Sequence, residues 1–462
     1  MNRYFNEKSN YDKYPVVNVP GMEEECRVGW RAISDRLEKD LSQIGKKVKV
    51  VVLECYQGVS DEEVVTALQS AFPASRWFFS ADAMKSPEQI DAILKQDITE
   101  DEIFGYMTRQ NMDCYFDGDK LPGIRSEIAA VTEGIVFVYG VGAAYVQPSY
   151  DLLVYADMAR WEIQMRFRRN EVSNVGISNR EERASLQYKR AFFVDWRICD
   201  RFKKKLMKKW DYVLDTNTAG NPKMATAKAI EAGLEKASRT PFRVVPFFDP
   251  GPWGGQWMKE VCDLDREVPN FAWCFDCVPE ENSLYLGFGD VRFELPSIDL
   301  VFAYPARLLG NPVYGRFGDE FPIRFDFLDT MEGGNLSLQV HPLTQYIQEK
   351  FGMHYTQDES YYMLDAAEDA TVYLGVKEGI EPEEMIDALN EAQESGCFDA
   401  EKYVGRYPVK KHDHLLIPAG TIHCSGTNGM VLEISATPYI FTFKLWDWGR
   451  LGLDGRPRPI NI

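Results

Sequence analysis

The stretch LSLQVHP at residues 336–342 decides how the chain is interpreted, together with PAGTIH at residues 418–423. Both stretches overlap the segment from Gln339 to His423, and this segment contains every histidine of the protein. Histidine is the commonest metal ligand in proteins, and imidazole, carboxylate and amide groups together suit a divalent ion. The clustering therefore predicts a metal site in this segment. The histidines are His341, His354, His412, His414 and His423.

Length and composition describe a folded protein of several domains. The 462 residues predict two to four domains, and 45% hydrophobic and 27% charged residues are ordinary for a globular chain. The net charge of -19 argues against a nucleic-acid partner, because phosphate contacts require positive surface. A small anionic substrate remains compatible with this charge, since it needs only a local basic pocket.

The nine cysteines are spread thinly and form no disulfide framework, which predicts a reducing, cytoplasmic environment. Cys274 and Cys277 form a lone CxxC pair, which is expected to be two free thiols. Residues 1–7 contain no apolar core like that of a signal peptide, and no apolar run approaches the ~18 residues of a membrane span. We therefore expect a cytoplasmic protein without a membrane partner.

The amino-terminal half has the pattern of an α/β domain. An apolar stripe predicts a helix over residues 22–44, and β-branched runs predict buried strands at 48–53, 134–140 and 151–157. Residues 159–170 are expected to form an arginine-rich helix. Residues 198–210 are expected to form an amphipathic helix with its lysines, Lys203 among them, in solvent.

This half resembles the P-loop kinases of the uridine-kinase type, which implies a parallel sheet within residues 1–222. The loop after the first strand, residues 54–60, has one glycine and no lysine, so the phosphate-binding motif is absent and ATP binding is not expected. The domain is thus predicted to be a degenerate P-loop-kinase-like domain. A purely structural α/β domain with a solvated basic helix is the alternative. Residues 223–241 are predicted to be a helical linker.

The carboxyl-terminal half, residues 242–462, changes to short apolar runs separated by glycine, proline and turn residues. Such a texture predicts many short strands, as in a sandwich or barrel. Strands are expected at 242–248, 283–286 and 300–304, and one helix is expected at 382–394.

Ordered motifs in this half resemble the type I phosphomannose isomerases, which are zinc-dependent enzymes of the cupin superfamily. The resemblance implies an all-β cupin (jelly-roll) barrel with a few helices. The matching segments are Pro252–Gly255, Phe321–Asp329, Leu336–Pro342, Glu359–Tyr362, Pro418–His423, Val431–Ile434 and Leu445–Arg450.

The resemblance implies one zinc ion per chain, with Gln339, His341, Glu359 and His423 as its ligands. The spacing agrees, because Gln339 and His341 are two residues apart and face the same side of a strand. Two imidazoles, one carboxylate and one amide oxygen form a mixed N/O site with room for a substrate oxygen. The alternative role for Gln339 is a hydrogen bond to a ligand, because amides are weak zinc ligands.

The implied activity belongs to carbohydrate metabolism: interconversion of mannose 6-phosphate and fructose 6-phosphate through a cis-enediol. Lys444 and Arg450 are the predicted cationic groups for the sugar phosphate. The family usually carries lysine at two positions that are Asp326 and Gln357 here, and residues 271–275 lack the acid of the family's GESWE-like segment. His412 and His414 are candidates for the base in their place, with ordinary surface histidines as the alternative.

The function expected is therefore a zinc-dependent aldose–ketose isomerase whose partner is a small sugar phosphate. The replaced lysines leave open a sugar-phosphate sensor or scaffold without turnover. A bifunctional kinase–isomerase is a third, weaker hypothesis. The sequence makes no prediction of the oligomeric state.

Overall fold

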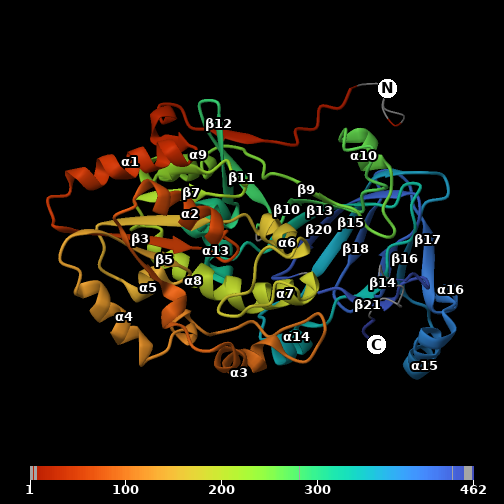
Figure 1. Ribbon diagram of the computed structural model, residues 1–462. Helices are drawn as coiled ribbons and strands as arrows, with labels where there is room; N and C mark the ends of the chain where they lie inside the picture. The colour runs from red at the N-terminus through yellow and green to blue at the C-terminus, as the bar shows by residue number, and fades with distance from the viewer. Residues whose placement is uncertain (1–3, 5–7, 280, 440, 452–459) are drawn as a thin grey trace. The chain divides into compact units, whose positions relative to one another are not determined.

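The computed structural model describes residue 4 and residues 8–279, 281–439, 441–451 and 460–462. The residues examined for a signal peptide lie mostly outside this part. The chain forms two compact units, each of several segments. Unit 1 consists of Met1–Tyr14, Val244–Asn282 and Glu320–Ile462, and unit 2 of Pro15–Arg243 and Ser283–Asp319. Figure 1 traces the chain through both.

Unit 2 contains a seven-stranded sheet of order β2-β8-β7-β6-β3-β5-β4. Strands β4, β5, β3, β6 and β7 are parallel, whereas β8 and β2 are antiparallel at the edge, so the sheet is mixed and not wholly parallel as predicted. These strands are β2 (Cys26–Val28), β3 (Val48–Cys55), β4 (Arg76–Phe79), β5 (Gly134–Gly140), β6 (Leu152–Asp157), β7 (Tyr212–Asp215) and β8 (Lys223–Thr226).

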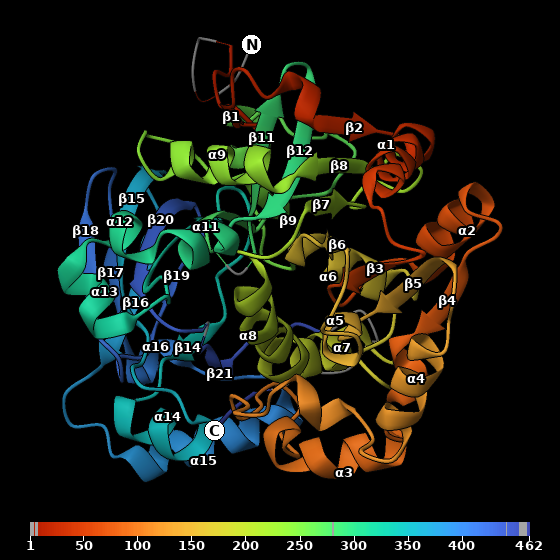
Figure 2. The same cartoon turned by 90° about the vertical axis from the view of Figure 1, so that its left-hand side faces the viewer.

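Helices flank this sheet, with α1 and α2 on one side and α7 and α8 on the other (Figure 2). The central strands β3 and β6 are buried on both faces, which explains their continuous apolar runs. The helices are α1 (Trp30–Gln43), α2 (Asp61–Ala71), α3 (Pro87–Ile98), α4 (Lys120–Ala129), α5 (Ala143–Val146), α6 (Arg160–Arg168), α7 (Ala184–Arg190), α8 (Trp196–Leu206) and α9 (Ala227–Ala237).

A second part of unit 2 comes from the carboxyl-terminal half of the sequence. Strands β11 (Ser283–Phe288) and β12 (Val291–Pro296) form a three-stranded sheet with β1 (Val16–Asn18). Helices α11 (Ile298–Ala303), α12 (Pro305–Leu309) and α13 (Asn311–Phe317) follow. Residues 300–304, expected as a strand, thus lie mainly in a helix, because their short apolar run has no period that separates the two structures.

Two other predicted segments differ in the structure. The helix expected over residues 22–44 begins only at Trp30, because Gly29 has a positive φ of 84° and β2 precedes it. The helical linker expected at 223–241 contains β8 and α9, whose first turn is capped by Thr226. Both elements lie inside unit 2, so the compact units follow other boundaries than the predicted domains.

Unit 1 consists of two sheets whose strands are not joined by hydrogen bonds into a closed barrel within the described residues. The six-stranded sheet has the order β18-β15-β20-β13-β10-β9. Its strands are β9 (Phe247–Asp249), β10 (Trp273–Cys277), β13 (Ile323–Asp329), β15 (Asp358–Ala366), β18 (His414–Ile417) and β20 (Gly429–Ala436).

The five-stranded sheet has the order β17-β16-β19-β14-β21. Its strands are β14 (Leu338–Val340), β16 (Thr371–Val376), β17 (Val404–Pro408), β19 (His423–Ser425) and β21 (Phe443–Trp446). The helices of unit 1 are α10 (Trp257–Val261), α14 (Thr344–Phe351), α15 (Pro382–Ser395) and α16 (Ala400–Tyr403), so unit 1 has a few helices beside its strands, as expected.

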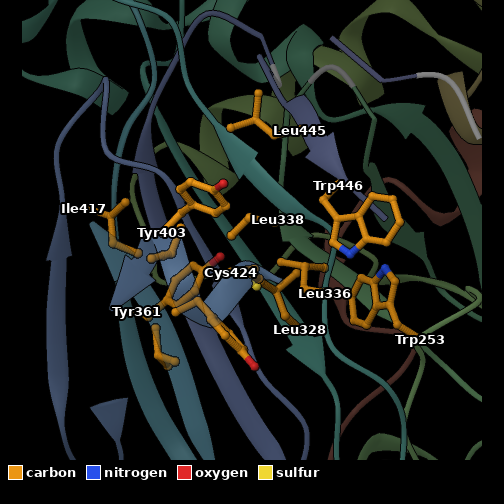
Figure 3. Close-up of a cluster of buried hydrophobic side chains, with 14 of the residues drawn as sticks. Trp253, Leu328, Leu336, Leu338, Tyr361, Tyr403, Ile417, Cys424, Leu445 and Trp446 are labelled. Carbon is orange, nitrogen blue, oxygen red and sulfur yellow. The ribbon is translucent and has the colours of Figure 1, made fainter. Parts of the chain in front are cut away.

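The core of unit 1 lies between the two sheets (Figure 3). Leu338 and Cys424 come from the five-stranded sheet, and Leu328 and Tyr361 come from the six-stranded sheet; all four are at most 2% exposed. The packing of both inner faces fixes which residues point into the interior, because side chains alternate along a strand. All nine cysteines of the chain are free thiols.

Buried ion pairs close the carboxyl ends of β3 and β6 in unit 2. The Lys203 Nζ atom lies 2.7 Å from both Asp157 oxygens and 2.8 Å from Asp299 Oδ1. Arg160 binds Asp200 and lies over the ring of Tyr56, 3.8 Å from its centroid. Lys203 and Arg160 are at most 1% exposed, so Lys203 is not the solvent-facing cation that helical periodicity predicted.

Substitution Lys203→Ala is expected to lower the free energy of unfolding by about 3–5 kcal/mol, because it leaves two buried carboxyl groups without their cation. Denaturant unfolding measures the change. Lys205→Ala, an exposed change two residues away on α8, is the matched control and should alter stability by less than about 0.5 kcal/mol. Equal stabilities of the two variants would contradict the role assigned to Lys203.

Glu54, at the end of β3, is expected to make the stability of the folded protein depend on pH. Burial raises the pKa of its carboxyl group to about 8, although the N–H groups of Gly142 and Ala144 donate to it. Between the ordinary value and 8, the folded state binds more protons than the unfolded state, so stability falls as pH rises through this window. From pH 5 to pH 8 the loss is at most about 4 kcal/mol.

The measurement compares urea unfolding of the wild type and Glu54→Gln at pH 5 and pH 8. The amide does not titrate, so the variant should lose less stability over this range than the wild type. Glu62→Gln, an exposed change on α2, should retain the wild-type pH dependence. A wild type and a Glu54→Gln variant with parallel profiles would refute the prediction.

Candidate metal centre and adjoining cavity

Three strands bring the candidate ligands together between the two sheets of unit 1. Gln339 on β14 lies directly opposite His423 on β19 in an antiparallel pair, and His341 follows β14. Glu359 comes from β15 in the other sheet, where it points inward with Tyr361 and Met363. The two sheets thus supply ligands from opposite sides.

The side-chain atoms of His341, Glu359 and His423 converge at one point. His341 Nε2 lies 2.9 Å from Glu359 Oε2, and His423 Nε2 lies 2.7 Å from Glu359 Oε1. The three potential ligand atoms all lie within 4.8 Å of one another. The two imidazoles are at most 1% exposed and Glu359 is 6% exposed.

Backbone carbonyl groups orient both imidazoles. The Nδ1 atom of His341 lies 2.7 Å from the carbonyl oxygen of Phe441, and that of His423 lies 2.8 Å from the carbonyl oxygen of Thr421. A carbonyl oxygen only accepts, so each Nδ1 carries the proton and donates it. Each Nε2 atom therefore presents a lone pair to the centre, as in histidines that ligate metals.

Gln339 lies at the edge of this cluster. Its side-chain nitrogen is 3.3 Å from His423 Nε2, and the residue is 5% exposed. Rotation of the amide by 180° exchanges its nitrogen and oxygen without moving other atoms, so the same position can present an oxygen to an ion. The position of Gln339 is thus compatible with both roles expected from the sequence, ligand or hydrogen-bond partner.

The electrostatics of the cluster favour an ionised Glu359. Burial by itself would raise the pKa of this carboxyl group, but the imidazoles of His341 and His423 outweigh burial and hold it well below its ordinary value. Burial opposes the charged form of His341, yet Glu359 and the carbonyl of Phe441 raise its pKa. A buried anion beside two imidazoles is also the arrangement that a divalent cation neutralises.

The residues present fit a divalent metal ion. His341 Nε2 and Glu359 Oε1 are buried polar atoms that make no hydrogen bond of acceptable geometry, despite the short contacts between them and their neighbours. Buried polar atoms are rarely left without a partner, and these two face the same point. Two imidazole nitrogens and one carboxylate oxygen are donors that zinc accepts.

Gln357 is a site residue whose role the sequence did not predict. Its amide nitrogen donates to Glu359 Oε2 at 2.9 Å, and its oxygen accepts from the N–H of Phe441 at 2.9 Å. Gln357 therefore links Glu359 to the segment that orients His341. The two-residue spacing of Gln357 and Glu359 was the available signal, since such residues share one face of an extended chain.

A cavity of about 250 Å³ adjoins the cluster. This volume lies just below the ~300 Å³ of typical small-molecule sites, so it suits a molecule about the size of one monosaccharide. Trp253, Trp273 and Phe275 provide an aromatic wall, and the remaining wall is largely polar. The polar and charged lining residues are Arg324, Asp326, Ser337, Gln339, Gln357, Glu433, Ser435, Thr442 and Lys444.

The two predicted cations occupy different places. Lys444 on β21 lies opposite Gln339 in the sheet and lines the cavity. Arg450 binds the carboxylate of Asp447 and the backbone carbonyl of Asn335, and it lines a separate cavity with residues of α15. The structure therefore brings Lys444, but not Arg450, to the cavity beside the cluster.

The other three histidines lie away from the centre. His412 and His414 are exposed beside Tyr362 on the outer face of the six-stranded sheet, and the Tyr362 hydroxyl lies 2.8 Å from His412 Nδ1. His354 is exposed after α14. Neither His412 nor His414 lines the cavity, because inward positions on β18 are those of Leu415 and Ile417.

Curated relatives of the chain are mannose-6-phosphate isomerases over about half of its length. It is 27% identical over 217 residues to the mannose-6-phosphate isomerase of Streptococcus mutans, with 46% of this chain and 61% of the relative covered. It is 28% identical over 227 residues to the putative mannose-6-phosphate isomerase YvyI of Bacillus subtilis, with 49% and 66% covered. The chain thus spans less than two thirds of these relatives' length.

Two solved structures and one family profile also match parts of the chain. The mannose 6-phosphate isomerase structure from Bacillus subtilis matches with a TM-score of 0.39 and 23% identity, and the match covers 47% of this chain and 65% of that one. A putative mannosephosphate isomerase from Archaeoglobus fulgidus matches with a TM-score of 0.37 and 18% identity, covering 45% and 66%. Residues 29–239 match a domain of unknown function (DUF8485).

The predicted resemblance to mannose-6-phosphate isomerases is therefore confirmed for about half of the chain, and the likeness to P-loop kinases stays a prediction. Among the described residues, no helix has both the length and the apolar character needed to cross a membrane.

His341→Ala is expected to lower the affinity for zinc by more than about 100-fold. Loss of a residue that merely orients a ligand costs about 10–100-fold, and loss of a ligand should exceed that. Calorimetric titration of metal-free protein measures the affinity. His412→Ala, which removes an exposed histidine of the same unit, should bind zinc as the wild type does. Unchanged affinity in His341→Ala would place the metal elsewhere.

Proposed function

We propose that the protein is a metal-dependent aldose–ketose isomerase that acts on a sugar phosphate, with mannose 6-phosphate and fructose 6-phosphate as the expected pair. The observation that carries the proposal is the His341–Glu359–His423 cluster beside a cavity of monosaccharide size. The mannose-6-phosphate isomerases among the curated relatives support the reaction class.

In this proposal, His341, Glu359 and His423 hold a zinc ion, with Gln339 as the fourth ligand. Once bound, zinc supplies Lewis acidity, which stabilises negative charge on a substrate oxygen during enolisation. Gln357 holds Glu359 in position, and the carbonyl groups of Phe441 and Thr421 fix the tautomers of the two histidines.

The cavity would orient the sugar. Its aromatic wall offers apolar surface to the C–H groups of the substrate, and its polar wall offers partners to the hydroxyl groups. Lys444 is the proposed partner of the phosphate, because it lies opposite Gln339 and lines the same cavity. Arg324 also lines the cavity, but it donates to the carbonyl oxygens of Thr437 and Pro438. A lysine amine provides three donors and a positive charge for phosphate oxygens.

The test is an isomerase assay on the whole chain. Zinc-loaded protein is incubated with mannose 6-phosphate, and fructose 6-phosphate is measured in a coupled assay. Turnover is expected, with loss of activity after chelation and recovery on addition of zinc. The His341→Ala variant is the matched control and should remain inactive at the same zinc concentration.

Absence of ketose product from mannose 6-phosphate and from related hexose phosphates, in protein that has bound zinc, would refute the proposed function. Lys444→Ala distinguishes the role of the cation: the KM for the phosphorylated sugar is expected to rise at least tenfold. A charge-assisted contact to phosphate contributes about 1.5–3 kcal/mol, which corresponds to a factor of about 10 or more.

A further inference from the structure

Among the residues that the structure describes, one carboxylate of the cavity has no hydrogen-bond or ion-pair partner. Asp326 lies on β13 and lines the cavity beside the candidate metal centre. Within the described residues, its carboxylate makes no hydrogen bond and no ion pair shorter than 4 Å. Asp326 is only partly buried, so its carboxylate is accessible from the cavity and available to a ligand bound there.

The sheet register places Asp326 at a defined distance from Glu359. Asp326 lies opposite Glu433 on β20, and Glu433 lies opposite Tyr361 on β15, two residues after Glu359. Strands about 4.8 Å apart and residues about 6.8 Å apart put the two Cα atoms about 12 Å from each other. Both side chains face the space between the sheets, and Asp326 lines the cavity that adjoins the cluster to which Glu359 belongs.

The other ionisable groups near Asp326 make contacts that give them roles other than proton transfer to the sugar. Glu433 contacts the Gln357 amide, which also holds Glu359. Arg324 donates to the carbonyl oxygens of Thr437 and Pro438, and a guanidinium stays protonated at neutral pH, so it cannot act as a base. Tyr361 is fully buried under the cluster, and Lys444 lies on the opposite sheet.

The environment of Asp326 also suits acid–base work. Burial raises the pKa of its carboxyl group well above the ordinary value, Glu359 adds to the effect, and Arg324 opposes it. A general acid–base group works best when its pKa lies near the working pH, so a raised carboxyl pKa suits repeated loss and gain of a proton.

We propose that Asp326 is the catalytic residue that carries the proton between C1 and C2 of the sugar, a role that rests on the proposed isomerase function. Its carboxylate takes the hydrogen from C2 of the aldose as a proton. The electron pair of the C2–H bond forms the second bond between C1 and C2. The π electron pair of the carbonyl group moves onto O1, which takes a proton from water. O2 then loses its proton to water and becomes the carbonyl oxygen, while C1 takes the proton back from Asp326.

The first experiment measures steady-state kinetics of the zinc-loaded Asp326→Asn variant with mannose 6-phosphate. The variant keeps the side-chain shape but not the base, so kcat should fall by about 10²- to 10⁴-fold while KM stays within about threefold. Asp326→Glu keeps the carboxylate, so its kcat should be at least tenfold higher than that of Asp326→Asn. Asp387→Asn, an exposed change on α15, should behave as the wild type.

A second experiment follows the proton itself and does not depend on the asparagine variant. The acid proton on Asp326 exchanges with solvent while the enediol is bound, so in D₂O the wild type should incorporate deuterium at C1 of the ketose, as NMR of the sugar phosphate detects. Asp326→Ala should lose both turnover and incorporation, and added formate, which fits the space of the missing carboxylate, should restore both.

The outcomes separate this inference from the function on which it rests. A wild type without turnover refutes the isomerase and the role of Asp326 together. An active wild type with an Asp326→Asn variant whose kcat lies within threefold refutes only the role of Asp326. Loss of zinc or of folding in Asp326→Asn, without formate rescue of Asp326→Ala, would also refute it and assign Asp326 a structural role.

Discussion

The enclosed carboxylate of Glu359 is the constraint on which the organisation of unit 1 depends. Removing an ionised carboxylate from water costs several kcal/mol unless donors or cations meet it. Two imidazoles and the Gln357 amide surround it, and each comes from a different point of the chain. A slip of one residue between β14 and β19 would turn Gln339 away from the interior, so the site and the register of the sheet depend on each other.

Buried charges must also be compensated in unit 2, but there the charges are cations and the protein itself supplies their partners. At the ends of β3 and β6, where a parallel sheet usually binds its ligands, the cations are neutralised by the protein's own carboxylates. Lys203 and Arg160 are fully enclosed, so they present little charge to a phosphate. The expectation, drawn from the missing glycine loop, that this half does not hold ATP stays a prediction.

Much of the local structure could be predicted from the sequence, because it depends on short-range patterns. The β-branched runs coincide with β3, β5 and β6, and the periodic segment at 382–394 coincides with α15. Segments whose structure depends on distant partners were not predictable. Residues 26–28 form a strand because β8, almost 200 residues later, pairs with them.

The residues of the candidate site and the buried cations also divide into those that could be predicted from the sequence and those whose position depends on distant partners. The resemblance to the isomerase family implied His341, Glu359 and His423 as ligands, and the structure brings these three together. The burial of Lys203 depends on Asp299, which is 96 residues away. Likewise, the outward position of His412 and His414 follows from which face of β18 packs on the core, and a strand's own alternation does not reveal this.

The segment from Ser283 to Asp319 makes the two units inseparable by a single cut. The chain passes from one unit to the other after Tyr14, Arg243, Asn282 and Asp319. A fragment that starts near residue 242 would carry β11 and β12 but lack β1, their parallel partner, and α9, whose Gly233 packs on Leu286. Isolating unit 1 therefore requires removal of this internal segment with a short bridge in its place. During synthesis, the sheet of β1, β11 and β12 is complete only after more than half of the chain has been made.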